Sequence, residues 1–277
     1  MADVLIAGCG DLGQRLANRV AGVHRVIGVR RQWREVPDTL VPHTCDLTDA
    51  RAVASLPRQI DALIFTPTPG ARGVAAYQAI YQTALTHIIE HYANHAPLLL
   101  MVSSTSVYGQ HRGEWVDEDS VTEPRQPTSQ CIVQGELLWA AQPQALRVRL
   151  SGIYGPGRSY LLNKARQAPL IAKDPPYYSN RIHQDDAVSA LLLLLNKAFD
   201  HQPLAPLYLV TDDDPAPLWD VVSWLAAQQG CPPPQAESRS PGAEQNKRCR
   251  NARIKALGLT LAYPDYRHGY QNFGEWR

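Results

Sequence analysis

The sequence Gly8-Cys9-Gly10-Asp11-Leu12-Gly13 decides the fold, because it stands between an apolar strand and a helix. Residues 4–7 form the predicted strand, and residues 12–21 carry the helical pattern. In that context G-x-G-x-x-G predicts a dinucleotide-binding turn, in which Gly10 leaves room for a pyrophosphate and Gly13 lets the helix pack closely on the strand. The N–H groups and positive dipole end of the helix would hold the anion. A strand-to-helix turn that binds no ligand is the alternative.

The second predicted strand, residues 25–29, leads directly into Arg30 and Arg31. NAD-binding proteins usually carry an acidic residue about 20 residues after the glycine turn, where it accepts hydrogen bonds from the ribose hydroxyls. A carboxylate would repel a 2′-phosphate, whereas guanidinium groups can pair with it. We therefore expect NADP(H) to be the preferred cofactor and NAD(H) to be the alternative. If the two arginines are only a solvated basic loop, no preference follows.

Strands and helices alternate through the N-terminal half, which predicts an α/β fold with a Rossmann-like, doubly wound parallel sheet. Further strands are expected at residues 43–46, 62–65, 98–103, 145–150 and 207–210, with helices at 49–54, 74–95, 130–141, 185–199, 217–230 and 252–257. Residues 231–246 are rich in proline and read as a mobile surface loop. We expect a dinucleotide-binding domain over residues 1–155, to which 181–210 return, and a small C-terminal substrate lobe formed by 156–180 and 211–277.

Composition excludes several classes of protein. The 277 residues include 27 basic and 26 acidic ones, and no basic stripe or cluster points to nucleic acid or to an anionic membrane. The longest aliphatic run, residues 191–195, is far shorter than the roughly 20 residues of a membrane span. A strand that directly follows the initiator methionine leaves no room for a signal peptide. Five scattered cysteines without metal-ligand spacing indicate reduced thiols, so we expect a cytoplasmic protein.

Four further segments share an order and spacing that resemble one family, the extended short-chain dehydrogenase/reductases, which contains the nucleotide-sugar epimerases and dehydratases. The segments are Cys45-Asp46-Leu47, Ser103-Ser104-Thr105-Ser106-Val107-Tyr108-Gly109, Arg149-Leu150-Ser151-Gly152-Ile153-Tyr154-Gly155-Pro156-Gly157-Arg158, and Asn180-Arg181-Ile182-His183-Gln184-Asp185-Asp186-Ala187. The resemblance covers nearly the whole chain, including Tyr263-Pro264-Asp265-Tyr266-Arg267 close to its end.

The resemblance implies a cofactor-binding sheet, a smaller substrate lobe and an active site between them. Asp46 and Leu47 would lie at the adenine, and Ser104 would be the catalytic serine that hydrogen-bonds the reacting hydroxyl or carbonyl. Arg158, Arg181 and His183 would lie where the family binds the phosphates of its substrates, which suits a phosphorylated or nucleotide-sugar substrate. For Ser104 the alternative is a turn residue that caps the strand end, and for the other three it is a structural salt-bridge cluster.

This sequence departs from the family at the catalytic dyad. Members that carry out redox chemistry use a Tyr-x-x-x-Lys pair, and the corresponding positions fall near Ser129 and Val133. Residues 109–153 contain neither tyrosine nor lysine. The glycine turn departs too, because Ala7 occupies the first glycine place of the family's G-x-x-G-x-x-G frame. The chain therefore resembles the atypical members, and Tyr154 and Tyr108 are the nearby candidates for a replacement acid.

Two readings of function follow. The first is an NADP(H)-dependent oxidoreductase, epimerase or dehydratase-like enzyme with an atypical active site. The second is a non-catalytic dinucleotide-binding protein that senses or regulates by cofactor occupancy. His87-Ile88-Ile89-Glu90-His91 matches a zinc-protease pattern, but solvated or subunit-interface histidines are the better interpretation and no metal is expected. Asp117-Glu118-Asp119 is interpreted as a solvated charge run, and a homodimer is an open alternative to a monomer.

Overall fold

The computed structural model describes residues 1–93, 95, 97–237 and 245–271. A seven-stranded sheet has the order β12-β7-β5-β4-β1-β2-β3, and β1 to β5 pair in parallel. The strands are β1 (Asp3–Ala7), β2 (Arg25–Arg30), β3 (Val41–Thr44), β4 (Ala62–Phe65), β5 (Leu98–Ser104), β7 (Ala145–Leu150) and β12 (Leu207–Val210). This is the predicted Rossmann-like α/β fold.

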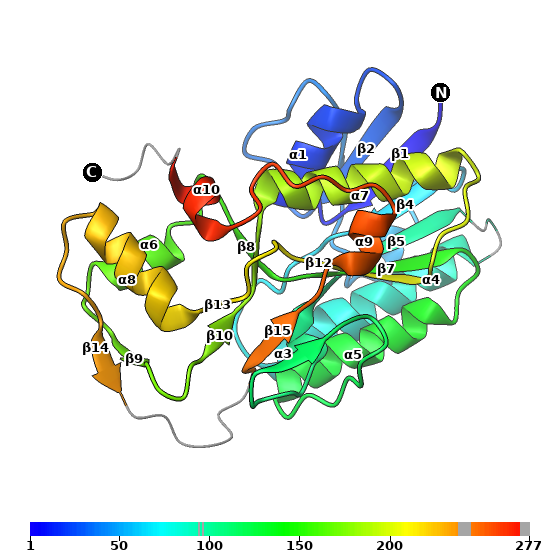
Figure 1. Ribbon diagram of the computed structural model, residues 1–277. Helices are drawn as coiled ribbons and strands as arrows, with labels where there is room; N and C mark the ends of the chain where they lie inside the picture. The colour runs from blue at the N-terminus through cyan, green and yellow to red at the C-terminus, as the bar shows by residue number, and fades with distance from the viewer. Residues whose placement is uncertain (94, 96, 238–244, 272–277) are drawn as a thin grey trace. The chain divides into compact units, whose positions relative to one another are not determined.

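Helices cover both faces of the sheet, and Figure 1 shows α1 and α7 on one side with α3, α4 and α5 on the other. They are α1 (Asp11–Val20), α2 (Ala50–Val53), α3 (Val74–Gln78), α4 (Leu85–Tyr92), α5 (Pro127–Ala140) and α7 (Gln184–Phe199), with the π-helical η1 (Ala79–Ala84) and the 3₁₀ turn η2 (Thr105–Val107). Between two covering layers a strand is apolar on both faces. Val4, Leu5, Ile6 and Ala7 of β1 are accordingly fully buried.

Local sequence explains where the first helices begin and end. On α1, Leu12, Leu16 and Val20 recur at helical spacing and are buried against the sheet. After that helix the chain turns at Gly22, whose φ of +89° suits glycine. Helix α2 starts after Asp49, whose side chain accepts the N–H of Arg51 at 2.9 Å. Both boundaries agree with the sequence pattern.

The contacts divide the chain into two compact units. Unit 1 comprises residues 1–107, 125–149 and 188–208, and unit 2 comprises 108–124, 150–187 and 209–277. Residues 108–124 group with unit 2 because β6 (Glu114–Val116) pairs in parallel with β15 (Lys247–Cys249). The remaining elements of unit 2 are β8 (Gly152–Tyr154), α6 (Tyr160–Ala165), β9 (Leu170–Ala172), β10 (Tyr178–Ser179), β11 (Arg181–His183), β13 (Ala216–Pro217), α8 (Leu218–Gln228), β14 (Gln235–Glu237), α9 (Ala252–Ala256) and α10 (Tyr266–Gln271).

Three predicted elements differ in the structure. The strand expected at residues 43–46 is β3, which begins and ends two residues earlier. The helix expected at 74–95 is a continuous helical run over 74–92 whose middle, η1, is π-helical, and η1 lies close to α5: a Cβ added at Gly135 would be 2.9 Å from the carbonyl oxygen of Tyr81. The loop expected at 231–246 contains β14, which pairs with β9, and residues 238–244 lie outside the described part.

None of the helices in the described part of the chain combines the length and hydropathy that crossing a bilayer requires. The five cysteines are all free thiols, and every one except Cys231 is buried.

Candidate functional site

The turn between β1 and α1 is shaped by Gly8. Its φ is +80°, and a Cβ at this position would lie 2.4 Å from the backbone nitrogen and Cα of Pro67. Its carbonyl accepts the hydroxyl of Thr66 at 3.0 Å, and its N–H donates to the carbonyl of Val29 at 3.0 Å. Only glycine fits here, so Gly8 fixes the path of the backbone as it leaves the sheet.

Gly10 has the opposite surroundings. A Cβ there would find only the carbonyl oxygen of Gly8, at 3.8 Å, so the space above the turn is open. Gly10 is also the N-cap of α1, and no side chain caps that end of the helix. Gly13 lies one turn on, where a Cβ would approach Ile6 to 3.0 Å, so helix and strand are in close contact. An open turn with uncapped N–H groups fits the pyrophosphate of a dinucleotide.

We call the open turn at Gly10, with the uncapped N–H groups of α1, the cradle. Asp11 places a carboxylate in the first turn of α1, next to the cradle. Arg15 Nε lies 2.9 Å from Asp11 Oδ1, so the carboxylate is paired and turned along the helix. Leu12 points into the core and contributes only its backbone to the turn. The cradle therefore keeps its positive character in spite of the acidic residue.

The two arginines at the end of β2 have different surroundings. Arg30 is half-buried, and its Cζ lies 5.3 Å from the centre of the Trp33 ring. Burial raises the pKa of the Cys9 thiol to about 12, and the charge of Arg30 opposes that rise. Arg31 is exposed, and its Nη2 lies 3.0 Å from where a Cβ on Gly70 would be.

Asp46 lies two residues beyond β3, at the same edge of the sheet. Its Oδ1 accepts the N–H of Thr48 at 3.0 Å and the Thr48 hydroxyl at 2.7 Å. These hydrogen bonds, with a smaller contribution from the charge of Arg31, lower the pKa of Asp46. The neighbouring Leu47 is buried. Gly10, Arg30, Arg31 and Asp46 thus all lie at the carboxyl ends of neighbouring parallel strands, where such sheets bind ligands.

The segment after β4 forms a cavity that the sequence did not indicate. Its volume is about 510 Å³, and it is lined by Thr68, Pro69, Gly70, Ala71, Arg72, Gly73, Tyr77 and Thr128. Arg31 contacts this segment at Gly70. A guanidinium, a phenol and two threonine hydroxyls make the wall polar, and the glycine and proline content of residues 67–73 was the available signal for a functional loop.

Ser104 ends β5 and is half-buried, and its Oγ accepts the N–H of Ser106 at 3.1 Å. The helix that would carry the dyad is α5, whose sequence PTSQCIVQGELLWA contains neither tyrosine nor lysine. Ser129 is only 3% exposed. Within unit 1, Ser104 therefore stands near a helix that supplies neither residue of the family's dyad.

The buried charge on α5 is Glu136, which belongs to an internal ion pair. Arg149 Nη2 lies 2.6 Å from Glu136 Oε2, and Arg149 Nε lies 2.9 Å from Oε1. The hydroxyl of Ser103 also donates to Oε1, at 2.5 Å. Glu136 and Arg149 are 2% and 4% exposed. The bidentate pair ties α5 to β7 inside unit 1.

Arg181 is a buried cation of unit 2, at 2% exposure, as is Lys247 at 3%. Its Nη2 donates to the carbonyl and the hydroxyl of Ser179, and its Cζ lies 5.2 Å from the Tyr266 ring centre. Nε and Nη1 have no hydrogen-bond partner among the residues that the structure describes. Burial raises the pKa of Asp212 well above its ordinary value, and the nearby charge of Arg181 opposes the rise.

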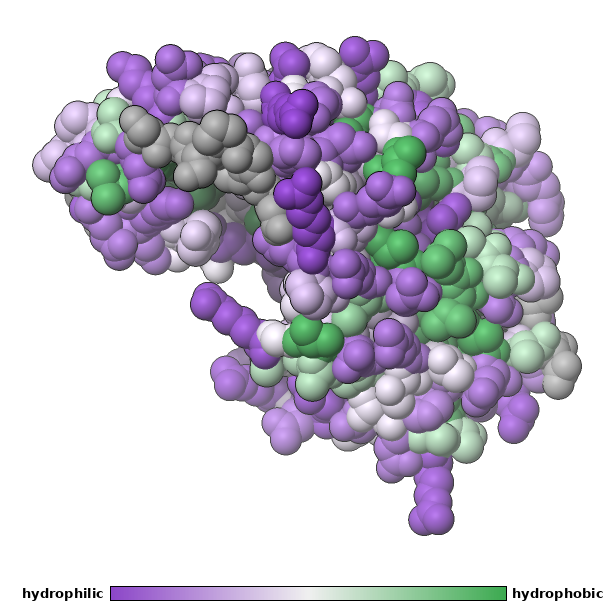
Figure 2. All heavy atoms as spheres, turned by 90° about the horizontal axis from the view of Figure 1, so that it is seen from below, coloured by the Kyte–Doolittle hydropathy of each residue, from purple (hydrophilic) through white to green (hydrophobic). Residues whose placement is uncertain are grey.

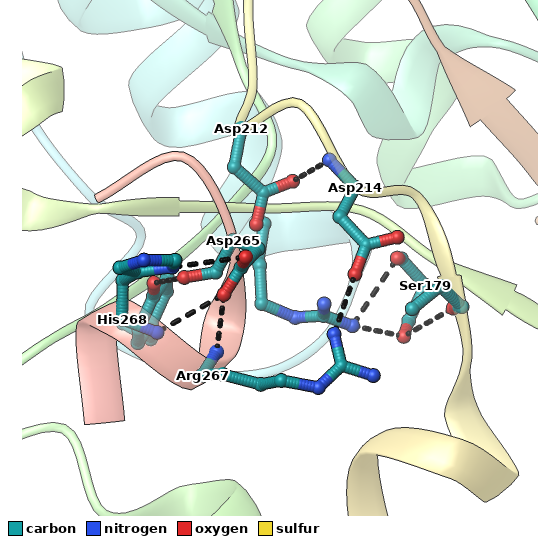
Figure 3. Close-up of polar contacts among 9 residues, drawn as sticks. Ser179, Asp212, Asp214, Asp265, Arg267 and His268 are labelled. Atoms are coloured by element: carbon teal, nitrogen blue, oxygen red, sulfur yellow. Dashed lines mark hydrogen bonds and ion pairs between the residues drawn. The ribbon is translucent and has the colours of Figure 1, made fainter. Parts of the chain in front are cut away.

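An outer layer of ion pairs surrounds this cluster (Figure 3). Asp212 Oδ1 accepts the N–H of Asp214 at 3.3 Å, and Arg267 Nη1 lies 3.4 Å from Asp214 Oδ2. His268 Nδ1 lies 2.9 Å from Asp265 Oδ2. The pair between Arg267 and Asp214 joins α10 to another part of unit 2, whereas the pair between His268 and Asp265 lies within the segment that begins this helix.

The other predicted residues of unit 2 are mostly packed inside it. The Tyr154 hydroxyl donates to the carbonyl of Asp265 at 3.3 Å, and burial raises its pKa. The hydroxyl of the fully buried Tyr108 donates to the carbonyl of Asp117 at 2.6 Å. His183 is 2% exposed and its ring centre lies 5.3 Å from that of Tyr154, whereas Arg158 is half-buried in a turn with Gly155.

Two interpretations of polar residues need correction. Glu118 is not solvated: it is 9% exposed, and its Oε1 accepts the N–H of Leu209 at 2.9 Å. His91 is not solvated either, because it is 9% exposed and its Nε2 lies 3.2 Å from the carbonyl of Leu56. His87 likewise lies 3.2 Å from the carbonyl of Leu47. In the described ranges, no three His, Cys, Asp or Glu side chains are grouped as metal ligands.

The chain is similar to a known protein family and to solved structures. The NAD-dependent epimerase/dehydratase family model matches residues 4–203. A Methylobacillus flagellatus structure, described as an NAD-dependent epimerase/dehydratase, is 33% identical over 97% of this chain and 96% of that one, with a TM-score of 0.81. A conserved Silicibacter pomeroyi DSS protein of unknown function is 29% identical over 97% and 96%, with a TM-score of 0.73.

A UDP-glucuronic acid 4-epimerase from Bacillus cereus, solved in complex with NAD, shares the fold at 16% identity. Its TM-score is 0.78, and the match covers 98% of this chain and 97% of that one. No curated protein matches. The glycine turn, the parallel sheet and a family match over most of its length lead to one conclusion: the chain belongs to the NAD-dependent epimerase/dehydratase family.

Proposed function

We propose that this family member prefers NADP(H) to NAD(H). The observation that carries the proposal is the pair Arg30 and Arg31 at the end of β2, beside the open cradle at Gly10. A 2′-phosphate at this edge would meet two guanidinium groups, and the carboxylate of Asp46 lies beyond β3 rather than at the end of β2. Asp46 and Leu47 would then border the adenine.

The reaction we propose is hydride transfer to or from a hydroxyl/carbonyl pair, with an atypical active site. NADP(H), when bound, supplies or accepts the hydride. Ser104 would orient the reacting oxygen through its hydroxyl, because it ends β5 and is half-buried. Tyr108 and Tyr154 are weaker candidates for the acid, since each is buried and already donates its hydroxyl proton to a backbone carbonyl.

The proposed substrate is anionic, such as a phosphorylated compound or a nucleotide sugar. Arg181 supports this proposal, because two of its nitrogens lack hydrogen-bond partners within the described residues, and an anion would satisfy them. Arg158 and His183 belong to the same unit and would assist. Solved proteins of this fold bind UDP-glucuronic acid or UDP-glucose together with NAD, at 16% and 22% identity to this chain.

A non-catalytic cofactor sensor is the second candidate, and the composition of α5 favours it. A positioned acid or base contributes roughly 10²–10⁴-fold to a rate, and α5 carries neither tyrosine nor lysine. Serine and valine at the dyad positions cannot replace such a group. A sensor would need only the cradle and the arginines, which the chain retains.

Turnover separates the two candidates. Nucleotide sugars and small carbonyl compounds are incubated with NADPH, and cofactor oxidation is followed. Turnover above about 1 s⁻¹, within the ordinary range of enzymes, that is lost in Ser104→Ala supports the enzyme. NADPH binding without turnover on the whole panel supports the sensor. An absence of binding to either dinucleotide contradicts both.

Two further parts of the proposal concern assembly and location. Leu137 and Leu138 on α5 are 58% and 41% exposed, and Figure 2 shows hydrophobic residues gathered on the face seen from below in Figure 1. We propose a homodimer through this face, tested by light scattering of Leu137→Asp together with Leu138→Asp. We also propose a cytoplasmic location, in keeping with five free thiols.

A further inference from the structure

Trp33 lies just beyond β2, outside any helix or strand, yet its ring rests on the sheet. The Cη2 atom is 2.9 Å from where a Cβ on Gly28 would be, and Leu40 Cδ2 is 3.0 Å from the same point. The missing side chain at Gly28 is therefore the space that the indole fills. Any larger residue in the middle of β2 would displace the ring.

The guanidinium of Arg30 lies over the face of this ring. The guanidinium carbon lies 5.3 Å from the ring centre, within the roughly 6 Å of a cation–π contact. The indole Nε1 lies 3.5 Å from the carbonyl of His43 on β3, which adds a long contact in the plane of the ring. Arg30 is thus held against an aromatic ring that is itself packed on β2.

Within the described residues, no aromatic ring supports Arg31 in this way. It is exposed and reaches over to Gly70, and its charge acts on Asp46. The two neighbouring arginines therefore differ in preorganisation, because one is already oriented and the other must leave a contact to move. A flexible cation loses more conformational freedom when it binds a phosphate than one that is already held in place.

We propose that Trp33 is a positioning residue for cofactor specificity: it holds the guanidinium of Arg30 where the 2′-phosphate of NADP(H) binds. This inference rests on the proposed NADP(H) preference and deepens it. Trp33 acts through Arg30, and the 2′-phosphate is the only part of the cofactor on which its removal should have a strong effect. The affinity for NAD(H), which lacks that phosphate, should not change when the Trp33 ring is removed.

Calorimetric titration tests the proposal with two variants. Trp33→Leu removes the aromatic face, and Trp33→Phe keeps an aromatic face without the indole N–H. In Trp33→Leu, NADPH and the probe adenosine 2′,5′-bisphosphate should bind about two- to five-fold more weakly, the change that the usual exposed cation–π energy gives. NADH affinity should stay the same, and Trp33→Phe should retain most of the NADPH affinity.

The chain offers a matched control in Trp115, which also carries arginines. Arg248 and Arg250 lie 4.8 Å and 5.0 Å from its ring centre, in unit 2. Trp115→Leu should leave both dinucleotide affinities unchanged. Fluorescence supplies a readout apart from affinity: the change on adding adenosine 2′,5′-bisphosphate should be present in the wild type and in Trp115→Leu, and absent in Trp33→Phe.

Each outcome decides one question. An equal loss of NADPH and NADH affinity in Trp33→Leu would make Trp33 a purely structural residue and overturn the inference. An unchanged NADPH/NADH ratio in Trp33→Leu, with a wild type that prefers NADPH, would overturn the inference and leave the NADP(H) preference standing. Equal wild-type affinities for the two cofactors would overturn the proposed preference itself, and the inference with it.

Discussion

The N-terminus of α1 and the body of α5 flank the same sheet but differ in what they retain. The turn before α1 keeps an uncapped helix end and an open space above Gly10. Helix α5 contains neither tyrosine nor lysine, and its buried charge pairs with Arg149 inside the protein. The comparison teaches that one sheet can carry a helix end open to a ligand and a helix whose charge is satisfied internally.

The largest effect should come from Gly10→Val, which tests whether the turn before α1 binds the cofactor. A branched side chain would occupy the open space, so NADPH binding should be abolished. Stability without cofactor should change little, because a Cβ meets only one atom within 4 Å, at 3.8 Å. Calorimetry and thermal denaturation measure the two quantities. A variant still stabilised by NADPH would show that the phosphates bind elsewhere. Gly8→Ala should instead lower the thermal stability of the apo protein, because a Cβ at this position would lie 2.4 Å from the backbone of Pro67.

At the other end, Glu136→Leu tests whether the polar group of α5 is structural. Removing one partner of a buried ion pair leaves Arg149 uncompensated, so the free energy of unfolding should fall by about 3–5 kcal/mol. Urea denaturation measures the loss, and Glu136→Gln, which keeps an acceptor, should lose less. NADPH affinity of the folded fraction should stay the same. A loss below about 1 kcal/mol, as for a surface pair, would contradict the assignment.

A smaller effect is expected on the preference for NADPH over NADH. Replacing both Arg30 and Arg31 by alanine should remove about 1–3 kcal/mol of NADPH preference, the range for hydrogen bonds to charged groups. NADH affinity should change little, so the ratio of the two calorimetric dissociation constants is the readout. A ratio that stays at the wild-type value would assign the preference to other residues, of which Arg72 in the neighbouring cavity is the nearest alternative.

The smallest effect is expected on the stability of the protein at acidic pH. Because the hydrogen bonds from Thr48 lower the pKa of Asp46 in the folded protein, Asp46 stabilises the fold above its unfolded pKa, and this contribution is lost as the pH falls through the folded value. The thermal midpoint of Asp46→Asn should therefore depend less on pH than that of the wild type below about pH 4, where free aspartate titrates. Parallel curves for the two proteins would mean that the Thr48 contacts do not hold the carboxylate in solution.

Sequence patterns predicted the elements whose cause is local. Residues 4–7 of β1 and all of β4 are continuous apolar runs, and the glycine turn has a fixed spacing between strand and helix, so both are visible in the sequence. The absence of tyrosine and lysine from residues 109–153 can also be read directly, whereas its consequence for the reaction stays a prediction. By contrast, β14 (Gln235–Glu237) is short and fully exposed, without an apolar pattern, and it is a strand because it pairs with β9.

Burial of polar groups was the main error, for a physical reason. A charged or titratable side chain is buried when a partner far along the chain satisfies it. Glu118 has the N–H of Leu209, and His91 has the carbonyl of Leu56, at separations that no local pattern encodes. Trp33 was overlooked for a related reason, because its contacts with Gly28 and Arg30 lie outside any helical or strand period.

The close packing of α5 limits which side chains this helix can accept. Gly135 lies against the backbone of Tyr81, so the helix cannot move closer to that segment, and Ser129 is buried. A variant with Ser129→Tyr and Val133→Lys would have to insert a phenol into filled space, at about 1–3 kcal/mol of overpacking. An engineered acid would therefore cost less stability at an exposed position than at Ser129.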